Sequence, residues 1–176
     1  FVEKHYPLLD GSHGGGAGTY VRIVSQELTK QGHKVSVITG FETYSEDGFF
    51  KDQDIDVYTQ NINSKVLWYI SKIPLINSLI FRSAEYLIKG YKKFRLIRRV
   101  NKKFKIDIIE YSSNGDFWQS IFKSIPYVVH FHGSKYTIDR FLKRKITFGD
   151  RLMSYFSGYF YKNASFIISP SQWMLT

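Results

Sequence analysis

A run of glycines directly before a helical pattern is the feature that most constrains the fold of this chain. Residues 14–18 read Gly-Gly-Gly-Ala-Gly, and the apolar positions that follow recur at the spacing of an amphipathic helix. Gly32 then stands where a helix ends in a left-handed turn, and residues 35–39 have the composition of a strand. A short apolar start at residues 1–2 precedes the loop. A strand, a glycine loop, a helix and a second strand predict the opening unit of a doubly wound α/β domain.

The glycine loop is also a candidate binding site. A residue without a Cβ lets the backbone turn sharply and approach a ligand closely. The first N–H groups of a helix have no partner within the helix, so they can hold an oxyanion. We therefore expect Gly15, Gly16 and Gly18 to bind substrate. The alternative is a tight turn that binds no ligand.

Strand and helix patterns alternate through the rest of the chain. Strands are expected at residues 55–58, 106–111, 127–132 and 165–169, and helices at residues 65–82 (broken at Pro74), from there to about 103, 116–123 and 148–161. Residues 40–54 are polar and predict a loop. This alternation predicts an α/β fold with a doubly wound, mostly parallel sheet and helices on both faces.

Composition narrows the class of protein. Apolar residues make up 43% of the chain and aromatic residues 18%, which indicates a globular rather than a disordered protein. The chain contains no cysteine, so it has neither a disulfide framework nor a catalytic thiolate. No apolar run reaches the roughly 18 residues of a transmembrane helix.

The elements expected at both ends of the sequence look incomplete, which predicts a piece of a larger protein. The first strand would hold only residues 1–2, whereas strands usually have about five residues. At the other end, residues 166–171 resemble a strand and a helix cap, and Thr176 follows within about one helical turn.

The positive charge is concentrated in one segment. Of the 25 basic residues, nine lie in residues 89–105, and no acid stands between Glu85 and Asp107. The other 16 basic residues nearly balance 15 acidic ones. Apolar residues recur at helical intervals in the same region, which predicts a basic amphipathic helix. We favour an anionic membrane surface as its partner, with a solvated outer face as the alternative, and we expect no nucleic acid because no recognition motif accompanies the cluster.

Candidate catalytic groups follow the strands. In doubly wound sheets, ligands bind beyond the carboxyl ends of the strands, where the turn containing Asn114 and the segment 130–134 would lie. His132 is the best catalytic candidate, because an imidazole at a strand exit beside a glycine can exchange hydrogen bonds near neutral pH. Gly133 and Ser134 follow it as candidate substrate contacts. A structural histidine is the alternative for His132.

Other templates fail. His130 and His132 would share one strand face, but there is no cysteine and no acid close by in the sequence, so we expect no metal. A Walker A loop would end in Gly-Lys-Ser/Thr, whereas Gly18 is followed by Thr-Tyr. The dinucleotide pattern fails because position 19 is threonine, and no nucleophile elbow is present. The missing dinucleotide pattern disfavours a nicotinamide enzyme.

Three segments, taken in order, resemble the retaining, family-four-like glycosyltransferases of GT-B architecture. Residues 15–21 leading to residues 31–39 resemble the start of those enzymes. Residues 128–134 resemble their strand that ends in the active-site histidine, and residues 167–172 resemble the serine-bearing strand exit that closes their N-terminal lobe.

The resemblance implies a two-lobed enzyme with its active site between the lobes. Residues 1–176 would be the Rossmann-like, acceptor-side N-terminal domain, truncated at both ends and inactive without the C-terminal nucleotide-sugar-binding domain. Gly15 and Gly16 would place backbone N–H groups near the donor diphosphate and the acceptor, and His132 would line the reacting sugar.

The resemblance also implies the partners. A nucleotide sugar would be the co-substrate, with no metal, and a polysaccharide or lipid-linked glycan such as lipopolysaccharide would be the acceptor. The basic helix adds the expectation of a cytoplasmic enzyme that lies at the inner face of the plasma membrane. The alternative function is a non-catalytic α/β module that holds a phosphorylated ligand through the glycine loop.

Overall fold

The structure is a computed structural model. It describes residues 1–7, 15–39, 47–61, 69, 72, 74–112, 115–131, 139 and 141–169, with the backbone alone for residues 74–80 and 82. The chain divides into two compact units. Unit 1 is Phe1–Ile62 with Ile109–Ser112, and unit 2 is Asn63–Ile108 with Ser113–Thr176.

Unit 1 contains a sheet in the order β1–β3–β2. The strands are β1 (Ser36–Thr39), β2 (Gly48–Asp52) and β3 (Ile55–Thr59). The central strand β3 runs parallel to β1 and antiparallel to β2, with Val57 opposite both Val37 and Phe50. The predicted loop over residues 40–54 is therefore wrong for β2, which pairs with β3 through a turn at Gln53, whose φ is 58°.

The first residues of the chain extend this sheet. Val2 forms parallel bridges to Ile38 of β1 and to Tyr111 of β4 (Ile109–Tyr111), so it lies between these two strands. The main chain is well bonded there, because Val2 N donates to Glu110 O at 2.8 Å and Glu3 N donates to Ile38 O at 3.0 Å. The expected parallel pairing at residues 1–2 is thus present, but as isolated bridges of Val2 rather than as a strand.

Helix α1 (Gly16–Lys30) provides the other half of the core of unit 1. Val21 on its inner face packs in a buried cluster with Tyr6, Val35, Val37, Ile55 and Val57. Gly32, with a φ of 88°, turns the chain after the helix, and its N–H bonds to Thr29 O at 2.9 Å. The predicted helix, its glycine stop and the strand that follows are confirmed.

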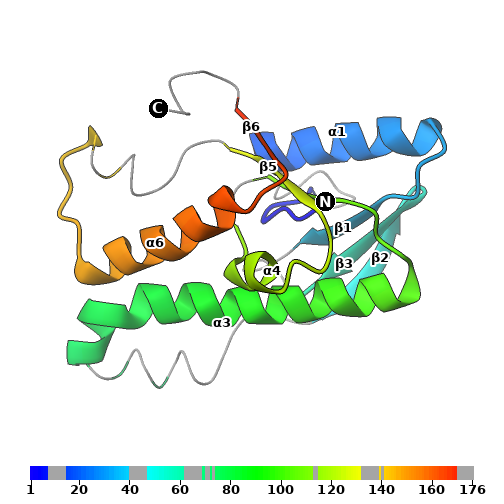
Figure 1. Cartoon of the computed structure of the whole chain (residues 1–176). Coiled ribbons are helices and arrows are strands. Elements are labelled where there is room, and N and C mark those ends of the chain that lie inside the picture. The colour runs from blue at the N-terminus through cyan, green and yellow to red at the C-terminus, as the bar shows by residue number, and fades with distance from the viewer. Residues whose placement is uncertain are drawn as a thin grey trace. The chain divides into compact units, whose positions relative to one another are not determined.

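Unit 2 is built on one long helix, α3 (Pro74–Lys103), which has proline at its first position, where the missing N–H costs nothing. Helices α4 (Phe117–Phe122) and α6 (Phe148–Lys162) pack against it (Figure 1). Trp118 Nε1 donates to Leu87 O at 2.8 Å, and Ser83 Oγ donates to Gly149 O at 3.0 Å.

Two parallel strands complete unit 2. They are β5 (Tyr127–His130) and β6 (Phe166–Ile168), with Val129 opposite Ile167. The Tyr127 ring stacks on Phe160 of α6 with 4.6 Å between centroids, and its hydroxyl donates to Phe160 O at 2.7 Å. Parallel pairs in both units, together with their helices, confirm the predicted α/β class.

Candidate functional site

The N-terminus of α1 is the part of the predicted site that the structure describes most directly. Gly15 is the N-cap, in an extended conformation with φ −83° and ψ 174°, and it provides no side-chain hydrogen bond to the first turn. A Cβ built on Gly15 or Gly16 would meet no atom within 4 Å. In the described part of unit 1, these two glycines therefore leave the helix N-terminus open to a ligand, as an oxyanion site requires.

Gly18 has a different environment from the other two glycines. A Cβ at Gly18 would lie 1.7 Å from the carbonyl oxygen of His5 and 2.8 Å from its carbonyl carbon. The strand exit at His5 thus packs directly on the helix backbone, which only glycine permits. This packing accounts for Gly18, and its predicted contact with substrate stays a prediction.

Polar side chains fix the ends of the strands beside this loop. Thr39 Oγ1, at the end of β1, accepts from Tyr6 N at 3.1 Å, and Ser112 Oγ, after β4, donates to Val2 O at 3.2 Å. Glu3 is buried, and its Oε1 accepts from His5 N at 3.1 Å. These bonds hold the exit of the first strand in one conformation under the N-terminal half of α1.

A buried charged network ties α1 to β2. The guanidinium of Arg22 on α1 donates from Nε to Asp52 Oδ2 at 2.8 Å and from Nη2 to Asp52 Oδ1 at 3.1 Å. The Tyr6 hydroxyl donates to Asp52 Oδ2 at 2.8 Å, and burial together with this carboxylate raises the pKa of Tyr6. This network orients α1 and therefore its open end. Sequence reasoning missed it, because no local motif marks residues so far apart.

The remaining predicted site residues are Asn114, His132, Gly133 and Ser134, and all of them lie outside the described residues. Their roles in binding and catalysis stay predictions. Among the residues that the structure does describe, no three His, Cys, Asp or Glu side chains gather in a way that could hold a metal ion. The expected independence of metal also stays a prediction.

Unit 2 contains a buried carboxylate that sequence reasoning treated only as a helix start. Asp116 is the N-cap of α4, and its Oδ1 accepts from Trp118 N at 3.1 Å. Burial raises the pKa of Asp116 from 3.8 to about 7, although the Lys93 ammonium and the N–H groups of Trp118 and Gln119 oppose the shift. The side chain that caps α4 is thus buried where its carboxylate form is less stable than it is in water.

We expect Asp116 to make the stability of unit 2 depend on pH. Because the pKa is higher in the folded state, the folded chain binds more protons between about pH 4 and 7, so this group's contribution is complete at low pH and is lost as the pH rises. Asp116→Asn keeps an oxygen for Trp118 N but cannot ionise. The free energy of unfolding of the variant relative to the original chain should rise from pH 4 to 8 by up to about 4 kcal/mol. Urea titrations across this range measure it, and parallel curves would contradict the shift.

No helix among the described residues combines the length and the apolar character needed to cross a bilayer.

Comparison with known proteins matches residues 14–176 to the model of Glycosyltransferase Family 4. A curated relative is the alpha-monoglucosyldiacylglycerol synthase of Streptococcus pneumoniae (strain ATCC BAA-255 / R6), which is 20% identical over 177 aligned residues. The alignment covers 98% of this chain and 34% of the relative, so the chain spans about a third of the length of that protein.

Proposed function

Since the chain belongs to glycosyltransferase family 4, we propose that it forms the acceptor-side part of an enzyme that moves a sugar from a nucleotide-sugar donor to a glycan or glycolipid acceptor. The reaction breaks the bond between the sugar anomeric carbon and the diphosphate oxygen. It forms a bond from that carbon to an acceptor hydroxyl oxygen, which releases its proton. Negative charge therefore develops on the departing diphosphate, and positive charge on the sugar.

The observation that carries this proposal is the open N-terminus of α1. No described residue obstructs the first turn at Gly15 and Gly16. Its N–H groups, together with the positive end of the helix dipole, suit an oxyanion such as a diphosphate. Donors fixed in advance stabilise charge that develops during a reaction better than mobile solvent does. The family resemblance implies that His132 would line the reacting sugar.

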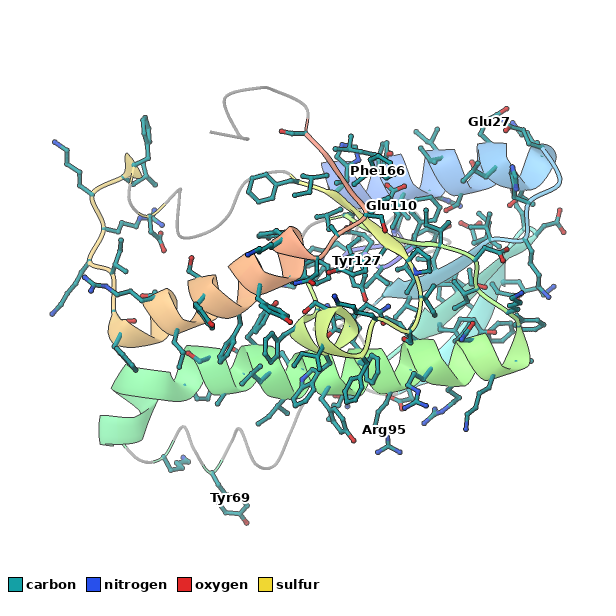
Figure 2. The ribbon with its side chains drawn as sticks, in the orientation of Figure 1. Glu27, Tyr69, Arg95, Glu110, Tyr127 and Phe166 are labelled. Carbon is teal, nitrogen blue, oxygen red and sulfur yellow. The ribbon has the colours of Figure 1, made fainter. Side chains whose placement is uncertain are left out.

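A lipid-linked acceptor is supported by the name of the relative, which is a diacylglycerol glycolipid synthase, and by the charge of α3. From residue 91 onward, α3 buries Phe94, Ile97 and Val100 and exposes basic residues on the other side. The predicted basic amphipathic helix is therefore confirmed as a helix with a cationic outer face. Figure 2 shows Arg95 projecting away from α3.

We propose that this cationic face lies on an anionic membrane at the cytoplasmic side of the cell. Its exposed basic residues, which we call the α3 cationic face, are Arg95, Arg98, Arg99, Lys102 and Lys103. Each cation near the headgroups contributes about 1 kcal/mol of attraction. The face would thus hold the enzyme where a lipid-linked acceptor is presented.

Reversing charge on this face should weaken membrane binding. We expect the triple variant Arg95→Glu, Arg99→Glu and Lys102→Glu to bind phosphatidylglycerol vesicles at least about 100-fold more weakly at low salt, because three attractions become repulsions. Vesicle sedimentation measures this effect. The matched control reverses Lys30, Lys34 and Lys51 of unit 1, which are also exposed and give the same change in net charge. An equal loss in both variants would show that only net charge matters.

The activity itself is tested with the full-length protein. Nucleotide sugars and a membrane lipid extract are supplied, and both the released nucleoside diphosphate and the labelled glycolipid are measured. Turnover that needs the lipid extract supports the proposal. Tight binding of nucleotide sugars or other phosphorylated ligands without turnover would favour the alternative, a non-catalytic binding module.

A further inference from the structure

A second surface of unit 2 mixes exposed apolar and basic side chains. It comprises the residues that lead into α6 and its first turn, and we call it the α6 entrance surface: Phe141, Leu142, Lys143, Lys145, Phe148 and Arg151. Phe141 is 72% exposed, Leu142 50% and Phe148 60%. The segment before α6 is drawn in gold in Figure 1. Large apolar side chains this exposed, and this close together, mark an interaction site more often than an inert surface.

The backbone under this surface is well fixed. Thr147 and Asp150 form a capping box at the start of α6, in which Asp150 N donates to Thr147 Oγ1 at 3.2 Å and Thr147 N donates to Asp150 Oδ2 at 3.0 Å. Before it, Arg144 N donates to Asp139 O at 2.8 Å. The bond from Ser83 to Gly149 attaches this end of α6 to α3. The apolar side chains are therefore held outward by a structured turn.

The charges are sorted by sign. Both acids among the described residues of this segment are buried: Asp150 in the capping box, and Asp139 beside the Arg144 guanidinium at 3.3 Å. The outward side chains are apolar or cationic. Lysine is depleted in the centres of protein interfaces, whereas cations around aromatic and aliphatic side chains suit the phosphate and acyl layers of a membrane. The charge pattern thus favours anionic lipid over a protein partner.

We propose that the α6 entrance surface inserts into the interface of an anionic bilayer, with Phe141, Leu142 and Phe148 among the acyl chains and Lys143, Lys145 and Arg151 at the lipid phosphates. The inference rests on the proposed membrane-bound acceptor, and it adds a second contact of a different kind. Ser83 adjoins α6, and the α3 cationic face begins at Arg95, about 18 Å further along the helix. One contact is electrostatic and sensitive to salt, whereas the other contributes apolar insertion that salt does not screen.

A fluorescent probe tests insertion directly. Since the chain has no cysteine, Leu142→Cys in the full-length protein, with any cysteine outside these residues replaced, can carry a single environment-sensitive NBD group. The control is Ile23→Cys on α1 of unit 1, because Ile23 is similarly exposed at 59%. With phosphatidylglycerol vesicles, the emission of the label at position 142 should shift to the blue and be quenched by nitroxide lipids, whereas the control should not change.

Two variants separate insertion from electrostatic attraction. Phe141→Ser with Leu142→Ser should lower vesicle binding in 0.5 M salt about tenfold or more, since the apolar contribution is lost, whereas Ile23→Ser should have no effect. The charge-reversed α3 variant should instead lose its binding at low salt. A label at position 142 that responds no more than the control would overturn the inference.

The labelling experiment also distinguishes a lipid bilayer from a second copy of the chain as the partner of this surface. A blue shift without vesicles that grows with protein concentration would assign the surface to a second copy of the chain and overturn the lipid assignment. Insertion that persists in a protein without transferase activity would refute the proposed function alone. Lipid glycosylation without insertion at position 142 would refute this inference alone.

Discussion

Replacing His132 by alanine in the full-length protein should lower kcat for sugar transfer by about 100-fold or more, while the free energy of unfolding changes little. If His132 has the role that the resemblance to family-four glycosyltransferases implies, its imidazole would face the reacting sugar and bind a hydroxyl or stabilise the developing charge. Groups that act in this way typically contribute 10²- to 10⁴-fold to a rate. Initial rates of nucleoside diphosphate release at saturating donor, together with a urea titration of each protein, measure both quantities.

The matched control for this experiment is His33→Ala. His33 is exposed in the turn after α1, and its main-chain N–H bonds to Leu28 O at 3.1 Å, which the substitution preserves. The control should therefore retain the original kcat and stability. If His132→Ala also retained the original kcat, His132 would have no catalytic role. If the free energy of unfolding of His132→Ala also fell by several kcal/mol, the loss of kcat would reflect a structural role of the histidine at the strand end.

The elements that were predicted correctly from the sequence are those with local signals. Helix α1 begins within the glycine run, is followed by Gly32 with a φ of 88°, and leads into β1 as expected. The basic half of α3 was predicted because its apolar residues recur at helical intervals through Ile97. In both cases the local spacing of apolar residues and glycines favours the conformation that the tertiary contacts also stabilise.

Strand β2 was missed because its sequence carries little strand signal. Gly48, Lys51 and Asp52 make it look like a loop, and Phe49 is 52% exposed at this edge of the sheet. What makes it a strand is its pairing with β3, which supplies hydrogen bonds along its whole length. Edge strands with polar residues are common in natural sheets, since they discourage pairing with other chains.

Part of the candidate site could likewise be predicted from local sequence signals, and part could not. The glycines at the start of α1 stand out in the sequence because loop and helix patterns meet there. Tyr6, Arg22 and Asp52, which orient that helix, are separated by many residues and lie in an irregular segment, α1 and β2 respectively. Their association depends on the register of β2 and on how α1 crosses the sheet, and neither can be read from short-range spacing. The network therefore becomes visible only once the fold is known.

Gly16 and Gly18 both lie at the start of α1, and substituting each of them separates the structural role from the proposed binding role of this helix end. Gly18→Ala should lower the free energy of unfolding by about 3 kcal/mol, because the new methyl group would overlap the His5 carbonyl, 1.7 Å away. That carbonyl cannot move aside easily, since Tyr6 beside it is bonded to Thr39 and Asp52. Urea titration of the variant measures the loss.

Gly16→Ala tests the proposed binding role at the same end of α1. Its Cβ would meet no atom within 4 Å, and alanine favours helix over glycine by up to about 1 kcal/mol, so the stability should stay the same or rise slightly. If the first turn binds the donor diphosphate, the added methyl group should nevertheless raise KM for the nucleotide sugar. Equal stability of the Gly16 and Gly18 variants would contradict the close packing of His5 on α1. A Gly16 variant with unchanged KM would instead remove the open helix N-terminus from the donor site, because nothing else in its described surroundings would be altered by that methyl group.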